Sequence, residues 1–168
     1  MNPIVAAGLL IGGLCGAWMF VMGFSGWYKD PQLAGLFFLV TIIEIGGLIW
    51  GLRKTAAQGR TYSGQVVAGT MIAIVAAGVI FVCSMTFTGV VFPEYFEEIN
   101  RATREFMRSQ GKSAAEIQAA IDAVAPGQTS VRYALAGVAG TFVTGVAASA
   151  IIAIWIRART APHVARST

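Results

Sequence analysis

Residues 66–92, VVAGTMIAIVAAGVIFVCSMTFTGVVF, form a run of 27 residues without a charged side chain. An α-helix crosses the hydrocarbon core of a bilayer in about 20 apolar residues, so this run predicts a transmembrane helix that tilts or projects beyond the membrane. Three other stretches, residues 4–23, 33–52 and 131–156, are also apolar and long enough to span a bilayer. We therefore expect an all-α, polytopic membrane protein with four transmembrane helices, in which residues 1–168 form a single membrane domain.

The composition excludes other classes of protein. Hydrophobic residues make up 56% of the chain and charged residues 12%, about half the charge that is usual in a soluble domain. The single histidine is His163, and Cys15 and Cys83 both lie inside apolar runs. We therefore expect neither a structural zinc site nor histidine-based chemistry. No cofactor and no other metal is expected, and no motif indicates nucleic-acid binding.

Basic residues predict the orientation of the chain. The loop between the second and third spans and the C-terminal tail contain no acidic residue. Because basic residues collect on the cytoplasmic side, we expect both termini in the cytoplasm of a bacterium, the spans in its inner (plasma) membrane, and residues 93–130 outside. These basic residues are Arg53, Lys54, Arg60, Arg157, Arg159 and Arg166. We expect them to act first as determinants of orientation, and all but Arg166 could also bind anionic membrane lipids.

The outside loop is predicted to fold as an amphipathic helical hairpin over residues 94–125. Gly111 is suited to end its first helix, and Ser113 with Glu116 forms a capping-box pattern that starts the second. The apolar faces of the two helices either pack on each other and on the outer membrane surface, or provide a docking surface for a partner protein. The candidate docking residues are Tyr95, Phe96, Ile99, Phe106, Ile117 and Ile121.

Glu44 is the one ionisable side chain deep inside a predicted span. A carboxylate is costly in hydrocarbon, which makes such a residue a functional candidate. Burial without a cation favours its neutral form. Counting along the spans places Thr70, Thr144 and Ser149 near its depth, so a structural role as hydrogen-bonded glue between helices is expected first. A contact with a partner, lipid or cofactor and a proton relay are the alternatives.

Small residues recur every four positions on two of the spans. Such stripes let helix backbones approach closely. They either pack the four spans into one bundle or meet a helix of a partner, and the span at 131–156 carries more small residues than a bundle requires. The stripes comprise Gly8, Gly12 and Gly16 on the first span and Gly137, Thr141 and Gly145 on the fourth.

Three motifs together resemble a bacterial membrane family known as domain-of-unknown-function family 4199. They are GRTYSGQ at residues 59–65, FPEY at 92–95 and GKSAAEI at 111–117. This chain departs from the family pattern at Phe92, where Asp or Asn is usual. The resemblance implies four spans with an outside helical hairpin, and it implies no activity.

Three classes of function remain. The first is a structural or accessory subunit, or interaction partner, of a larger inner-membrane complex, with a membrane-protein partner or a homo-oligomer. The second is a small transporter or channel that uses Glu44. The third is an enzyme, which would need a site built from the charged residues of the hairpin, and we do not expect it. The missing catalytic residues and the small-residue stripes place the accessory protein first.

Overall fold

The computed structural model describes residues 2–156. The predicted basic residues Arg157, Arg159 and Arg166, together with His163, lie outside this range. All regular elements of the described part are helices. Four of them are long and apolar enough to cross a membrane, so the prediction of an all-α protein with four transmembrane helices is confirmed.

The spans are longer than the sequence predicted at several ends. Helix α1 covers Pro3–Ser25, and the second span consists of a 3₁₀ segment, η2 (Ala34–Phe38), followed by α2 (Leu39–Ala56). The third consists of α3 (Tyr62–Thr86) and one π-helical segment, η3 (Phe87–Val91), and α6 covers Ser130–Ile156. The polar residues 53–55 near the end of α2 and 62–65 at the start of α3 are also helical. Helical hydrogen bonds there satisfy backbone N–H and C=O groups.

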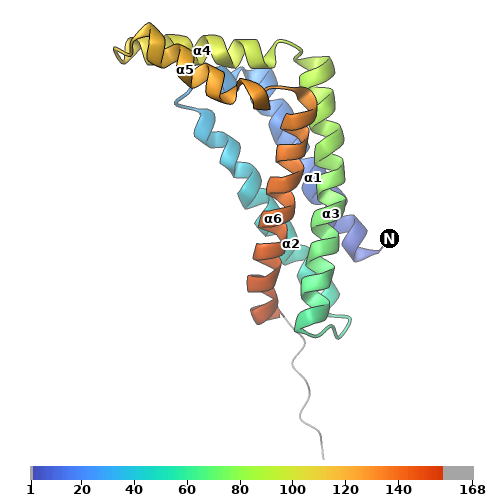
Figure 1. The fold of residues 1–168 in the computed structure, drawn as a ribbon. Coiled ribbons are helices and arrows are strands. Elements are labelled where there is room, and N and C mark those ends of the chain that lie inside the picture. The colour runs from blue at the N-terminus through green and yellow to red at the C-terminus, as the bar shows by residue number, and fades with distance from the viewer. Residues whose placement is uncertain (1, 157–168) are drawn as a thin grey trace, which may run out of the picture.

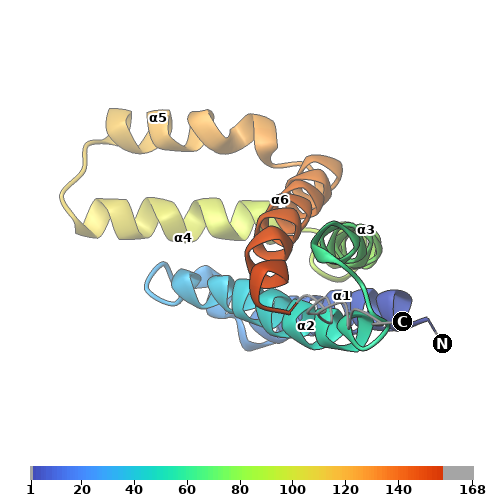
Figure 2. The same ribbon diagram turned by 90° about the horizontal axis from the view of Figure 1, so that it is seen from below.

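Helix α3 packs against both α1 and α6, while α2 packs against all three. In Figure 2, seen from below, α3 is nearly end-on with α6 and α1 beside it, and α2 runs across the view. The end of α6 and the turn between α2 and α3 lie at one end of the bundle, opposite the hairpin (Figure 1). We call these the turn end and the hairpin end.

An apolar core fills the half of the bundle nearer the turn end. It contains buried residues of α1, α2 and α3: Ala7, Ile11, Cys15, Leu48, Leu52, Ala68, Ile72 and Ala76. Gly47 and Gly51 of α2 admit this packing, because a Cβ atom on Gly47 would lie 2.3 Å from Ile11 Cγ1 and one on Gly51 would lie 2.7 Å from Ala7 Cβ. The close contact of α1 with α2 therefore depends on these two glycines.

The hairpin end has a second, aromatic cluster. Phe87 and Tyr95 are buried there with Met19, and the ring centroids of Phe87 and Tyr95 are 5.1 Å apart in an edge-to-face arrangement. Phe92 lies in this cluster, with its ring centroid 4.7 Å from that of Phe87. An apolar contact therefore joins the third span to the hairpin at this position.

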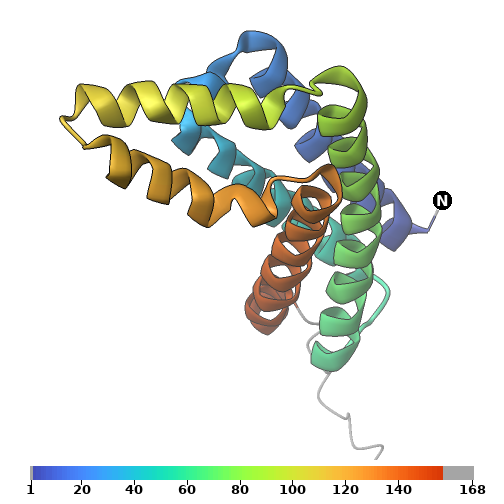
Figure 3. The same ribbon diagram turned by 45° about the horizontal axis from the view of Figure 1, so that its top comes forward.

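The predicted hairpin consists of α4 (Tyr95–Ser109) and α5 (Ala114–Val124), followed by a 3₁₀ turn, η4 (Ala125–Gly127). Gly111 has φ +76°, the left-handed conformation that favours glycine. The capping box is formed by Ser113 and Glu116, each side chain bonding the other residue's backbone N–H. Figures 1 and 3 show the two helices crossing the end of the bundle side by side and projecting beyond the spans.

Candidate functional site

Glu44 lies on α2 between the apolar core and the aromatic cluster. Its side chain is 6% exposed, and its Oε1 atom has no hydrogen-bond partner among the described residues. It lines a cavity of about 400 Å³ between α1, α2, α3 and α6, which we call the Glu44 cavity. A buried carboxylate without a partner is costly, so this arrangement requires an explanation beyond packing.

The expected hydrogen bonds from Glu44 are not formed. Thr70 donates instead to the carbonyl of Val66 on its own helix, at 3.0 Å, as buried threonines in helices commonly do. Ser149 is fully buried, its Oγ has no hydrogen-bond partner among the described residues, and it packs against Gly69 of α3. Of the three predicted partners, Thr144 alone joins Glu44 in lining the cavity.

The depth count failed because it used position along the membrane normal and not rotation about each helix axis. Two residues at the same depth face each other only when both helices turn them toward the same space. The structure brings Thr41 and Thr141 to the Glu44 cavity beside Thr144. Neither threonine belongs to the polar group that the count predicted around Glu44. All three hydroxyl groups can donate or accept a hydrogen bond.

The remainder of the cavity wall is largely apolar. Phe38, Ala136 and Gly140 line it and are exposed on the surface of the bundle, so the cavity reaches the lateral surface between α2 and α6. Its lining contains no lysine, arginine or histidine. Toward the turn end, the apolar core of α1, α2 and α3 follows directly along the chain, with Leu48 one helical turn after Glu44.

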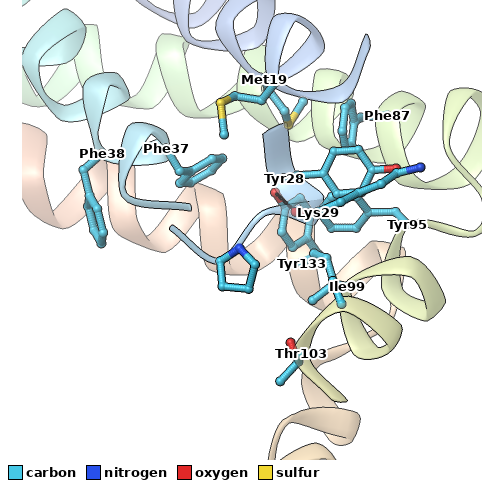
Figure 4. A pocket seen from close by; sticks show the side chains of 13 residues that line it. Met19, Tyr28, Lys29, Phe37, Phe38, Phe87, Tyr95, Ile99, Thr103 and Tyr133 are labelled. Atoms are coloured by element: carbon cyan, nitrogen blue, oxygen red, sulfur yellow. Dashed lines mark hydrogen bonds between the residues drawn. The ribbon is translucent and has the colours of Figure 1, made fainter. Parts of the chain in front are cut away.

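A second cavity of about 400 Å³ adjoins the first on the side of the hairpin, and we call it the hairpin-side cavity. The two cavities share Met19, Phe37, Phe38 and Tyr133 in their linings. Figure 4 shows Phe37 and Phe38 at one side of the hairpin-side cavity, and Phe87 with the grouped tyrosines at the other. The linked cavities thus follow a path from the hairpin end toward Glu44.

The border of the hairpin-side cavity contains a polar contact that the sequence did not indicate. Lys29 Nζ lies 2.8 Å from Glu98 Oε1, and Tyr28 donates a hydrogen bond to the same carboxylate. The hydrogen bond from Lys29, and to a smaller extent that from Tyr28, holds the pKa of Glu98 below its usual range. Burial, together with the hydrogen bond to Glu98, raises the pKa of Tyr28. This contact ties the α1–α2 connection to the base of α4.

The predicted docking residues of the hairpin are mostly in contact within the chain. Ile117 and Ile121 are buried on α5, which packs against α4. Tyr95, Phe96 and Ile99 belong to the aromatic cluster. Phe106 is the exception, with 36% of its surface exposed. Five of the six residues predicted for docking are therefore buried or half-buried within the chain, and Phe106 is exposed.

The small-residue stripes also meet neighbours in the same chain. A Cβ atom would lie 2.5 Å from Val75 Cβ if placed on Gly8, and 2.6 Å from Cys83 Sγ if placed on Gly16. These neighbours belong to α3, and the stripe of α6 faces α3 as well, since a Cβ atom on Gly145 would lie 2.5 Å from Ala73 Cβ. On α1, Gly12 packs against α3 between Gly8 and Gly16. On α6, Gly137 also lies close to α3, and Thr141 is buried.

A buried polar contact at the turn end was also missed. Gln65 is fully buried. Its Oε1 accepts a hydrogen bond from Thr55 Oγ1 at 2.6 Å, and its Nε2 donates to the carbonyls of Leu52 at 3.3 Å and Ile156 at 3.4 Å. One side chain thus connects α2, α3 and α6. Its place at the end of the GRTYSGQ motif was the available signal.

Comparison with known proteins provides a family and no activity. A family model described as "Protein of unknown function (DUF4199)" matches residues 7–158, which include most of α1, the hairpin and the three other spans. No curated protein and no solved structure matches the chain. The match confirms the resemblance carried by the three motifs. The chain is a membrane protein that belongs to this family of unknown function, DUF4199.

Proposed function

We propose that the chain is a non-enzymatic membrane protein that works as a small transporter, with the Glu44 cavity as its substrate site. The observation that carries the proposal is the unpartnered, buried carboxylate of Glu44 in the wall of a cavity that reaches the surface of the bundle. An ionisable group inside the membrane most often marks a substrate or ion pathway.

Packing within the chain accounts for the other features that the sequence singled out. The glycine stripes of α1 and α6 are in contact with α3, and the isoleucines of α5 are buried. Glu44 has no such explanation, because its Oε1 accepts no hydrogen bond from the described residues. A structural role predicts bonds to neighbouring helices, which would offset the cost of burying the group.

The shape of the site agrees with a substrate path from one side. The two adjoining cavities extend from the hairpin end toward Glu44, while the apolar core occupies the bundle toward the turn end. A transporter alternates access between the two sides, so this arrangement corresponds to the state open toward the hairpin. We place the spans in a bacterial inner membrane and the hairpin outside the cytoplasm, because basic residues gather at the turn end.

Flux measurements in proteoliposomes test the proposal. We expect uptake of at least one solute from a panel of lipophilic cations, anions and neutral molecules to exceed that of protein-free liposomes, and Glu44→Gln to abolish the excess. Glu97→Gln is the matched control, because it neutralises an exposed carboxylate of α4 that lies outside the spans and lines neither cavity. Equal flux with the native protein, with Glu44→Gln and with empty liposomes would contradict transport.

The second candidate is an accessory or interaction subunit of a larger complex, and one observation favours it. The hairpin projects beyond the spans (Figure 3), with Phe106 exposed on it. A partner protein, or a second copy of the chain, would then contact this region. Native mass spectrometry after extraction in mild detergent tests the idea, with Phe106→Glu expected to release the partner. A chain that runs alone as a monomer would count against it.

A further inference from the structure

We propose that the Glu44 cavity binds a lipophilic ammonium, that is, an apolar molecule with one protonated amine. The proposal rests on the function proposed above and names the class of its substrate. It is argued from the charge, the lining and the size of the cavity.

The charge of the site favours a cation. Glu44 is 6% exposed and its Oε1 has no hydrogen-bond partner among the described residues, and the lining of the cavity contains no basic side chain. A carboxylate in a low-dielectric site is stabilised by a cation that also donates a hydrogen bond. Since the lining residues contain no such cation, a ligand with a positive charge would supply it.

Among the described residues, the basic side chains lie at the two ends of the bundle or in the hairpin. Lys29, in the lining of the hairpin-side cavity, pairs with Glu98 at 2.8 Å. Arg53 and Lys54 are in the last turn of α2, at the turn end. Both lie more than two helical turns beyond Glu44. The other titratable groups in the lining of the Glu44 cavity are Cys15, Cys83 and Tyr133, none of which carries a positive charge.

The rest of the lining fits an apolar molecule with an amine. Phe37, Phe38 and Tyr133 present aromatic rings, whose faces attract cations when desolvated. Thr41 and Thr144 line the same cavity. Threonine hydroxyl groups can accept hydrogen bonds from the two N–H groups that a primary ammonium has left after pairing with Glu44. Each part of an amphipathic amine therefore has a matching surface.

The size and position of the cavity allow entry from the membrane. Its volume of about 400 Å³ lies within the usual range of small-molecule sites, about 300–1,000 Å³. Phe38, Ala136 and Gly140 line it and are exposed between α2 and α6. A molecule dissolved in the bilayer would therefore reach Glu44 without crossing the aromatic cluster at the hairpin end.

Equilibrium dialysis tests the proposal with the full chain in lipid nanodiscs and three radiolabelled probes of equal chain length: dodecylamine, dodecanol and dodecanoate. Empty nanodiscs of the same lipid provide the background. At neutral pH we expect dodecylamine to bind above this background at least tenfold more tightly than dodecanol, and dodecanoate not to bind. Glu44→Gln should weaken the binding of dodecylamine at least tenfold, whereas Glu97→Gln, at an exposed position of α4 that lines neither cavity, should leave it unchanged.

A second variant guards against loss of folding in Glu44→Gln. Gly140→Leu places a side chain at the exposed border of the cavity, where a Cβ atom meets nothing within 4 Å, and should weaken amine binding while Glu44 is retained. Equal binding of the amine and the alcohol, preference for the carboxylate, no binding above empty nanodiscs, or binding indifferent to both variants would each overturn the proposal. Amine binding without flux would refute transport alone. Glu44-dependent flux of another solute, with no amine binding, would refute the amine alone.

Discussion

Gly69 of α3 and Ser149 of α6 touch so closely that no methyl group fits between them. A Cβ atom on Gly69 would lie 2.0 Å from Ser149 Oγ and 2.4 Å from Ser149 Cβ. This contact sets the separation of α3 and α6 next to the Glu44 cavity. Gly145 lies one turn before Ser149 on α6, and a Cβ atom there would lie 3.2 Å from Glu44 Oε1. The width of the cavity therefore depends on small residues at this crossing.

We expect Gly69→Ala to lower the free energy of unfolding by about 1–3 kcal/mol, the usual cost of overpacking. Gly78→Ala is the matched control on the same helix, because a Cβ atom there meets nothing within 4 Å. Thermal unfolding in mild detergent measures the difference. Addition of Ser149→Gly to Gly69→Ala should restore much of the loss, and failure of this rescue would show that another contact limits the crossing.

The contact of α1 with α3 predicts a similar asymmetry between two adjacent glycines. Gly12→Ala should destabilise the bundle, since its Cβ atom would lie 2.5 Å from Val79 Cβ and 2.9 Å from the backbone oxygen of Ala76. Gly13→Ala should have little effect, because no atom lies within 4 Å of its Cβ position. Unfolding midpoints of the two variants in the same detergent provide the comparison, and equal midpoints would contradict the packing.

Replacement of Gln65 by leucine should destabilise the turn end. The variant removes the hydrogen bond that buried Thr55 Oγ1 donates to Gln65 Oε1 and the one that Gln65 Nε2 donates to the half-buried carbonyl of Ile156. A buried polar group that loses its partner costs about 1–3 kcal/mol. Gln58→Leu, at an exposed position near the same turn, is the control. Hydrogen exchange of the last turn of α6 should rise in Gln65→Leu, and unchanged exchange there would argue against the bond.

The contact of Lys29 and Tyr28 with Glu98 should make stability depend on acidic pH. The pKa of Glu98 is lowered in the folded state, so its contribution is present above the ordinary glutamate pKa of about 4.3 and is lost as the pH falls through the lower, folded value. Because the side chain of Lys29 is 48% exposed and that of Glu98 is 24% exposed, solvent screens the pair and the effect should be below about 1 kcal/mol. Native protein and Glu98→Gln should differ in unfolding midpoint at pH 7 and converge once the pH has fallen below the lowered pKa of Glu98.

The proposed orientation can be tested with a membrane-impermeant maleimide on intact cells. Ser109→Cys, in a protein whose Cys15 and Cys83 are replaced by alanine, should be labelled from outside, because Ser109 is exposed at the end of α4. Gln58→Cys, exposed at the turn end, should react after permeabilisation alone. The reverse pattern would invert the orientation.

Local sequence signals were sufficient for most of the fold. Length and hydropathy identified the four spans, because each must bury its own backbone hydrogen bonds in hydrocarbon. The capping box at Ser113 and the glycine at position 111 located the turn of the hairpin, since both act within a few residues. The start of α3 at Tyr62 was missed, because the polar residues 62–65 precede the apolar run on which the prediction was based.

The site depended on tertiary structure. Hydropathy singled out Glu44 from the sequence alone, because an acid in a long apolar run is visible without a fold. The sequence could not show that its Oε1 lacks a partner, that Thr70 bonds to its own helix, or that Glu98 meets Lys29 69 residues away. Those facts depend on how each helix is rotated about its axis, and close contacts between helices, such as that of Gly69 with Ser149, decide that rotation.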